Sequence, residues 1–210
     1  MRVVKVVFMN KKARELTAER FLKQVDRRLR IYGNNRHFNK SNPLDEMIFI
    51  ILSAQTESYS YVETFKELRR RFPTRQSLLS ARESRIASAI KRGGLHEKKA
   101  AQLKGAFRRI FIDTGKLSLA FLSKMDNAAV EKYLTLLPGI GVKSARCIMM
   151  YSLNRQVFPV DTHIWRISRR FGLVPAFPKP SPEMEKEPEE IIPEGIRFTL
   201  QTQSHLEGEK

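Results

Sequence analysis

The spacing of apolar residues is the feature that most restricts what this 210-residue chain can fold into. Apolar side chains recur at intervals of three and four along most of the sequence, and few segments alternate as a half-buried strand would. This spacing predicts amphipathic helices and therefore an all-α fold. Helices are expected near residues 14–31, 43–54, 58–71, 82–91, 97–113, 127–136, 142–153 and 162–171.

Residues at the expected helix ends support this prediction. Asn42 can cap a helix that begins at Pro43, since its side chain can accept hydrogen bonds from free amides of the first turn. Gly172 follows the last apolar residue of the final helix and is a common stop residue. The stretch that follows, residues 175–193, is rich in Pro and Glu and is typical of a linker or a poorly ordered surface segment.

Composition limits the class of protein. Hydrophobic residues make up 41% of the chain, enough to bury a core. No apolar run approaches the roughly eighteen residues that a membrane span requires, and the start of the chain lacks a signal-peptide pattern. We therefore expect a cytoplasmic protein, associated with the nucleoid if prokaryotic. The single cysteine, Cys147, excludes an internal disulfide and any metal site built on several cysteines of this chain.

The charge is strongly basic and unevenly distributed. The chain carries 39 basic and 22 acidic residues, a net charge of +17. Residues 181–210 hold eight acids and three bases, so residues 1–180 hold 36 bases and 14 acids, a net charge of +22. Such an excess favours a polyanionic partner that binds the body of the chain. Charge alone leaves ribosomal association as an alternative to a specific DNA enzyme.

The most informative segment is LPGIGVKSA, residues 137–145, a tight turn between two expected helices. Gly139 and Gly141 allow a sharp turn and a close approach of the backbone to a ligand. The next helix begins at the turn, so its free amides and its positive dipole end face whatever occupies the loop. This arrangement suits a DNA phosphate. A simple helix-turn-helix connection without a ligand is the alternative.

Lys143 lies in the first turn of that helix. The positive end of the helix dipole disfavours a further positive charge there and so favours the neutral amine. A neutral amine in a partly desolvated site can attack a sugar carbon and form an imine. The alternative is that Lys143 is one phosphate-facing cation among many.

A second informative segment is FPVDTHIWRISRRFG, residues 158–172. Asp161 precedes a strongly periodic helix and is expected to cap it. A carboxylate held by amides stays ionised, which also suits it to stabilise a developing oxocarbenium ion. His163 is assigned only a packing or hydrogen-bonding role, because no partners for metal or acid-base chemistry can be placed.

Together these segments resemble the helix-hairpin-helix and Gly/Pro-Asp motifs of the endonuclease III branch of DNA glycosylases. Two upstream segments agree, since LSAQ at residues 52–55 and GLHEKKA at residues 94–100 resemble motifs of the same family. The resemblance covers about residues 15–175. It implies two helical lobes that flank a DNA-binding cleft. One is a six-helix barrel from 38 to 150, and the other combines 1–37 with 151–210.

The resemblance also implies roles for individual residues. Lys143 would attack C1′ of the damaged nucleotide, and Asp161 would assist departure of the base. Gln55 and Leu95 would fill the gap left by the flipped nucleotide, which offsets part of the unstacking cost. Backbone phosphate would be held by the hairpin residues Gly139, Ile140, Gly141 and Ser144.

The sequence departs from the family at two places. The four C-terminal cysteines that commonly bind a [4Fe–4S] cluster are missing, so no cluster and no other metal is expected; a monovalent cation at the hairpin is left open. Ser58 stands three residues after Gln55, where relatives often carry Asp, which leaves the lesion pocket undefined. Lys143 argues against the adenine-mismatch and thymine-mismatch branches.

The sequence therefore predicts a bifunctional DNA glycosylase and AP lyase, expected to be monomeric. Its expected partner is double-stranded DNA with a damaged base or an abasic site, the base being an oxidised pyrimidine. Two alternatives are kept. One is a glycosylase for mismatched or alkylated bases, and the other is a degenerate DNA-binding protein without activity.

Overall fold

The computed structural model describes residue 23 and residues 39–56 and 58–160, and every structural statement below refers to these residues. The chain divides into two compact units, Phe38–Arg155 and the combination of Met1–His37 with Gln156–Lys210. Almost all described residues belong to the first unit. The boundary expected at 150 falls inside the last described helix, which continues to Leu153.

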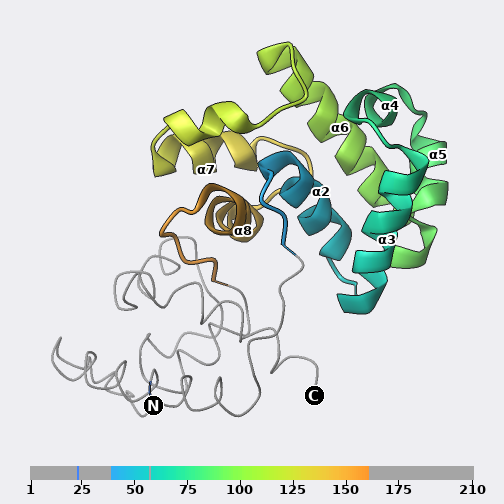
Figure 1. Cartoon of the computed structure of the whole chain (residues 1–210), viewed down its shortest axis with the longest axis horizontal. Helices are drawn as coiled ribbons and strands as arrows, with labels where there is room; N and C mark the ends of the chain where they lie inside the picture. The colour runs from blue at the N-terminus through green and yellow to red at the C-terminus, as the bar shows by residue number, and fades with distance from the viewer. Residues whose placement is uncertain (1–22, 24–38, 57, 161–210) are drawn as a thin grey trace, which may run out of the picture. The chain divides into compact units, whose positions relative to one another are not determined.

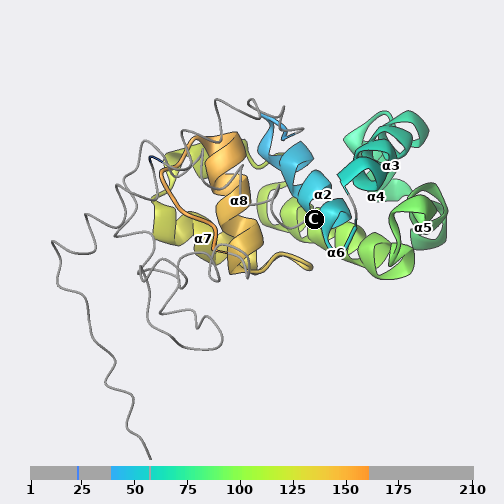
Figure 2. The same cartoon turned by 90° about the horizontal axis from the view of Figure 1, so that it is seen from below.

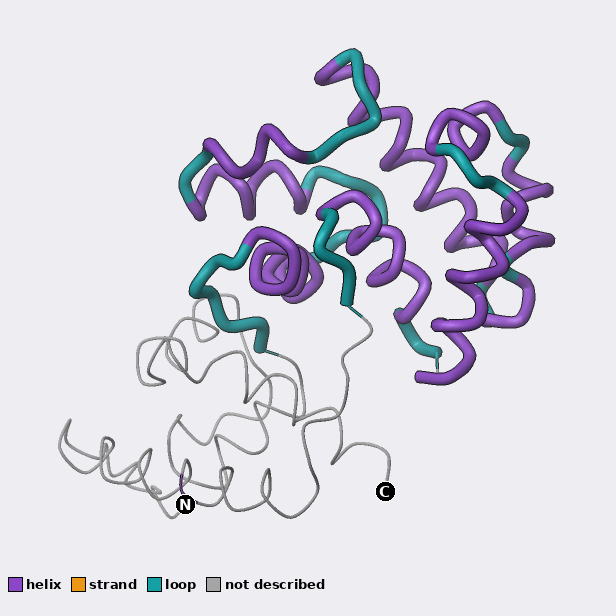
Figure 3. Tube along the Cα trace, in the orientation of Figure 1, coloured by secondary structure: helices purple, strands orange, loops and turns teal. Residues whose placement is uncertain are grey.

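The described part is helical, without strands, which confirms the all-α prediction there (Figures 1 and 3). Its elements are α2 (Pro43–Ser53), α3 (Ser58–Arg71), α4 (Arg75–Ser80), α5 (Glu83–Ala89), η1 (Lys91–Gly93), α6 (His96–Thr114), η2 (Ala120–Lys124), α7 (Asn127–Thr135) and α8 (Val142–Leu153). The helices expected near 14–31 and 162–171 lie outside the described residues. None of the described helices is long and apolar enough to cross a membrane.

Helix α2 is the central helix of the unit. It packs against α3, α6 and α8, with α8 on one side and α3 on the other (Figure 1). The apolar run from Met47 to Leu52 explains this position, because it leaves almost no polar face to present to water. The predicted cap is confirmed: the Asn42 side chain accepts hydrogen bonds from the amides of Leu44 at 3.0 Å and Asp45 at 3.3 Å.

Helix α6 passes beside α2 and contacts α5 and α4 as well (Figure 2). Its apolar face includes Leu103, Phe107 and Ile110, which are fully buried or nearly so. Two lysines share the buried side of this helix, Lys99 with 2% and Lys104 with 6% of their surface exposed. Lys104 Nζ donates to the carbonyl oxygens of Leu79 and Ala81, at the end of α4. A buried ammonium group thus satisfies carbonyls that the end of a short helix leaves free.

Glu46 is a buried acid in the middle of this apolar environment. Its side chain is fully buried, and one carboxylate oxygen, Oε2, accepts a hydrogen bond from the Lys40 amide at 2.5 Å. The other oxygen, Oε1, has no hydrogen-bond partner among the described residues. Burial raises the pKa of Glu46 from 4.5 to about 7, because the charged form is poorly solvated.

This raised pKa predicts a pH dependence of stability. A carboxyl group that binds its proton more tightly in the folded state stabilises the fold below pH 4.5, and this contribution is lost as the pH rises through about 7. Glu46→Gln should remove that loss and increase the free energy of unfolding at pH 8 by up to roughly 3 kcal/mol. Urea unfolding at pH 4.5, 6 and 8 measures the effect. Parallel pH profiles for the wild type and the variant would contradict it.

Candidate functional site

The hairpin between α7 and α8 has the tight geometry that its glycines predict. The Leu137 amide donates to the Leu134 carbonyl at 3.0 Å, and the Ile140 amide donates to the Leu137 carbonyl at 3.1 Å. Gly139 has φ +86°, a left-handed conformation that disfavours a residue with a Cβ. Ile140 is 95% buried, and its side chain belongs to the core.

The two glycines of the hairpin serve different purposes. A Cβ on Gly139 would lie 2.8 Å from Gln102 Cδ, because the turn rests on the Gln102 side chain of α6. The contact next to it is similar, since a Cβ on Gly105 of α6 would lie 3.0 Å from Pro138 Cγ. At Gly141, in contrast, a Cβ would meet nothing within 4 Å. Gly139 thus seats the hairpin on α6, while Gly141 leaves an open surface for a ligand.

The start of α8 is not capped by a side chain. Gly141 is the N-cap residue and offers no side-chain acceptor, and the first turn holds no acid. Amides at such a helix start, together with the positive dipole end, can bind an anion. Lys143 and Ser144 lie in this first turn, and both are half-buried. One turn further on, Arg146 Nε donates to Glu131 Oε2 at 2.7 Å and ties α8 to α7.

Gln55 and Leu95 share an unusual backbone conformation. Gln55 has φ 53° and Leu95 has φ 46°, and both side chains are exposed, that of Leu95 by 47%. A left-handed residue that is not glycine costs of order 1–2 kcal/mol and persists only where neighbouring structure holds it. Backbone positions of this kind cluster at ligand-binding sites.

The loops that carry Gln55 and Leu95 lie against each other. Thr56 Oγ1 donates to the Gly93 carbonyl at 2.6 Å, which joins the segment after α2 to η1. Lys99 Nζ donates to the carbonyls of Leu52 at 2.8 Å and Gly93 at 2.9 Å, and also to Thr56 Oγ1 at 2.6 Å. Burial lowers the pKa of Lys99, since no acid in the described ranges lies beside it to offset the loss of solvation.

The structure therefore places the predicted site residues that it describes in two groups. One is the hairpin with Gly139, Ile140, Gly141, Lys143 and Ser144, and the other is the pair Gln55 and Leu95. Asp161 lies outside the described residues. Sequence reasoning missed Lys99 as a contributor, because nothing distinguishes a buried lysine among 39 basic residues.

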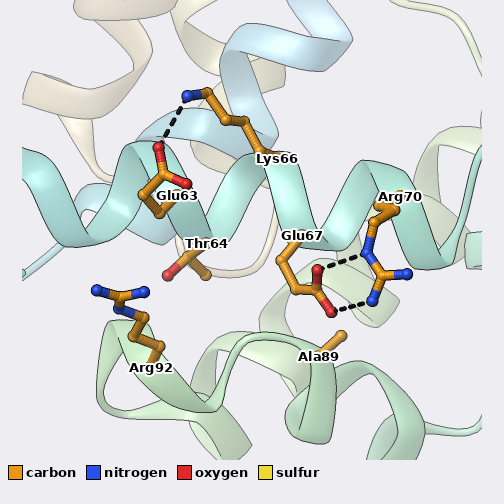
Figure 4. Close-up of a pocket in the computed structure, with 7 residues that line it drawn as sticks. All are labelled: Glu63, Thr64, Lys66, Glu67, Arg70, Ala89 and Arg92. Carbon is orange, nitrogen blue, oxygen red and sulfur yellow. Dashed lines mark hydrogen bonds and ion pairs between the residues drawn. The ribbon is translucent and has the colours of Figure 1, made fainter.

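A separate cavity of about 380 Å³ lies between α3 and the α5–η1 segment (Figure 4). It is lined by Glu63, Thr64, Lys66, Glu67, Arg70, Ala89 and Arg92. Figure 4 shows that its acids are paired within α3, Glu63 with Lys66 and Glu67 with Arg70, each at 2.8 Å. None of the predicted site residues that the structure describes lines this cavity, so we assign it to the solvated surface.

Comparison with known proteins identifies the family. Residues 48–194 match the family model described as the HhH-GPD superfamily base excision DNA repair protein, and the chain belongs to this superfamily. A solved structure titled as a non-covalent endonuclease III–DNA complex superimposes with a TM-score of 0.72 at 22% identity, covering 89% of this chain and 84% of that one. The fold is therefore of the endonuclease III type.

Curated relatives are similar over part of their length. The putative DNA glycosylase At3g47830 of Arabidopsis thaliana is 34% identical over 132 residues, which are 63% of this chain and 45% of the relative. DNA glycosylase/AP lyase ROS1 of the same plant is 32% identical over 105 residues, 50% of this chain and 8% of the relative. Endonuclease III of Thermotoga maritima is 26% identical over 161 residues, 77% of this chain and 70% of the relative. The chain thus spans less than half of the two plant relatives.

The iron–sulfur cluster implied by the family does not fit the residues of this chain. Such a cluster is held by four cysteine thiolates. The sequence contains one cysteine, Cys147, which is buried within α8. The described residues also lack any group of three His, Cys, Asp or Glu side chains that would hold a metal ion.

The two glycines predict opposite results on substitution. Gly139→Ala should lower the free energy of unfolding by about 1–2 kcal/mol, because φ is positive and the new methyl group meets Gln102. Gly141→Ala should change it by less than about 0.5 kcal/mol, since its methyl group enters open space. Thermal and urea unfolding measure both values. An equal decrease in the free energy of unfolding in the two variants would show that the turn does not rest on Gln102 as described.

Proposed function

We propose that this chain is a bifunctional DNA glycosylase that removes damaged bases, oxidised pyrimidines in particular, and cuts the strand at the abasic site. The observation that carries the proposal is the position of Lys143 in the first turn of α8, beside an uncapped helix start. Two similar proteins support it. One relative is named a DNA glycosylase/AP lyase, and one fold neighbour is a trapped endonuclease III–DNA covalent intermediate.

The hairpin would hold a phosphate of the damaged strand. The amides at the start of α8 supply donors, and the open space at Gly141 lets the phosphate reach them. Contacts of this kind position the duplex without reading its sequence. Binding would thus place the backbone of the damaged nucleotide beside Lys143.

Lys143 would then supply the nucleophile. Its neutral amine attacks C1′, the C1′–N bond breaks, and the base leaves with the electron pair of that bond and takes up a proton. Opening of the sugar ring gives an imine between Lys143 and C1′. Loss of a proton from C2′ then eliminates the 3′ phosphate, and water releases Lys143. Asp161 would stabilise positive charge on the sugar while the base departs.

Gln55 and Leu95 would fill the space that the damaged nucleotide leaves in the duplex. A base must leave the stack before its glycosidic bond is accessible, at a cost of a few kcal/mol. The exposed side chains of Gln55 and Leu95 are suited to this insertion, because their loops are held together and Leu95 is apolar.

Trapping with borohydride tests the nucleophile. Wild-type protein incubated with an abasic duplex and borohydride should form a covalent adduct, because reduction fixes the imine. Lys143→Gln should abolish the adduct and retain most of the binding affinity. Lys132→Gln is the matched control, since Lys132 is an exposed lysine on α7 and its loss removes the same charge. Denaturing gels measure the adduct.

Two outcomes would contradict the proposal. Undiminished trapping by Lys143→Gln would assign the nucleophile to another residue. Binding without any adduct would indicate the degenerate DNA-binding protein. If the adduct forms, duplexes with thymine glycol, uracil, mismatched thymine or an alkylated purine test the lesion preference, and preferred excision of a mismatched or alkylated base would replace the oxidised pyrimidine.

Asp161→Asn separates the electrostatic role of Asp161 from capping. Asparagine caps a helix almost as well as aspartate, so we expect stability to change by less than about 0.5 kcal/mol. Excision of the base should slow by about two orders of magnitude, because the charge that stabilises the transition state is lost. Single-turnover excision assays measure this rate. A variant as fast as the wild type would leave Asp161 only its capping role.

A further inference from the structure

The Lys99 side chain, like that of Thr56, joins the loop after α2 to the loop before α6. Its ammonium group is almost completely buried, and it donates to Leu52 O, Gly93 O and Thr56 Oγ1 at 2.6–2.9 Å. The three N–H donors of an ammonium group are therefore all used. These partners lie at the ends of α2 and η1, where helix dipoles favour a cation.

The oxygens that Lys99 holds are close in sequence to the two left-handed residues. Thr56 directly follows Gln55, and Gly93 lies two residues before Leu95. The Thr56 hydroxyl also donates to Gly93 O, so that a single polar cluster contains both loops. Gly93 has little freedom to shift, because a Cβ there would lie 3.0 Å from Thr64 Oγ1 of α3. A displacement of Lys99 would consequently change the separation of Gln55 and Leu95.

We propose that Lys99 is a positioning residue that fixes Gln55 and Leu95 at one separation, so that the pair enters the duplex gap as a preformed unit. The inference rests on the proposed function, in which these two side chains fill the gap. Preorganisation strengthens binding because the ordering cost is met before the ligand arrives. Lys99 itself is too deeply buried to contact DNA.

A variant of Lys104 is the control that distinguishes this positioning role from a general contribution to the stability of the fold. It is a second buried lysine of α6, and it also donates to carbonyl oxygens at a helix end. The segment that it holds, the end of α4, contains no described residue with positive φ. Lys104→Met therefore removes a comparable set of buried hydrogen bonds without disturbing either loop at the gap.

The experiment uses a duplex with a tetrahydrofuran abasic analogue opposite 2-aminopurine, whose fluorescence rises when the base loses its stacking partners. Wild-type protein and Lys104→Met should raise the fluorescence at saturation and prefer this duplex over undamaged DNA. Lys99→Met should reduce that preference about tenfold, as loss of a charge-assisted hydrogen bond implies, and should give less than half of the fluorescence rise. Thr56→Val, which removes the bridging hydroxyl and keeps the side-chain shape, should fall between them.

The inference is overturned if Lys99→Met and Thr56→Val both match the wild type, or if Lys104→Met loses the preference to the same extent as Lys99→Met. Thr56→Val alone decides the question if Lys99→Met does not fold. Failure of the proposed function looks different. If the wild type unstacks 2-aminopurine, Lys99→Met loses this effect and neither protein forms a borohydride adduct, the role of Lys99 is supported and the chemistry is refuted. Wild-type protein that forms the adduct but does not unstack 2-aminopurine supports the chemistry and refutes the role of Lys99.

Discussion

Contacts between helix α6 and the backbone of its neighbours organise the described unit. Lys99 holds the ends of α2 and η1, and Lys104 holds the end of α4. Gln102 and Gly105 receive the hairpin. Both parts of the candidate site are thus located relative to one helix. A rigid element of this kind is needed where binding groups must keep their positions to within fractions of an ångström.

A purely apolar α6 would pack well but would leave the carbonyl groups at the ends of α2 and α4 without their lysine donors, and the Gly93 carbonyl with the Thr56 hydroxyl alone. Each such buried group costs of order 1–3 kcal/mol. A buried ammonium group is itself costly, since no acid among the described residues neutralises Lys99. The cost of the buried ammonium group is offset by the carbonyl groups that it satisfies. This holds only in the observed geometry, in which every N–H of Lys99 donates a hydrogen bond. Such a fully satisfied polar cluster specifies one arrangement of the loops, whereas apolar contacts alone would tolerate several.

The sequence predicted helices whose apolar pattern extends over several turns, and motifs whose residues are contiguous in the chain. It predicted α2, α3, α5, α6, α7 and α8, together with the hairpin, but not α4, whose six residues contain too few apolar positions to show a period. The role of Gly139 was only partly anticipated, since the sequence cannot show that the turn rests on Gln102. Leu95 would have been assigned to ordinary packing from its type alone, yet it is half-exposed. Burial of Lys99 depends on distant segments and leaves no local signal.

The contact between Gly139 and Gln102 couples two positions that lie far apart in the sequence. A smaller residue at 102 would remove the contact with a side chain on the turn, although the positive φ of position 139 would still strain it, and a longer residue at 102 would push the turn outward even with glycine retained. Divergence of the hairpin therefore requires paired changes on α6, while position 141 is free of any such pairing and can vary with the ligand alone. Substitutions at position 139 would therefore follow changes in the packing of α6. Substitutions at position 141, only two residues away, would follow changes in the ligand.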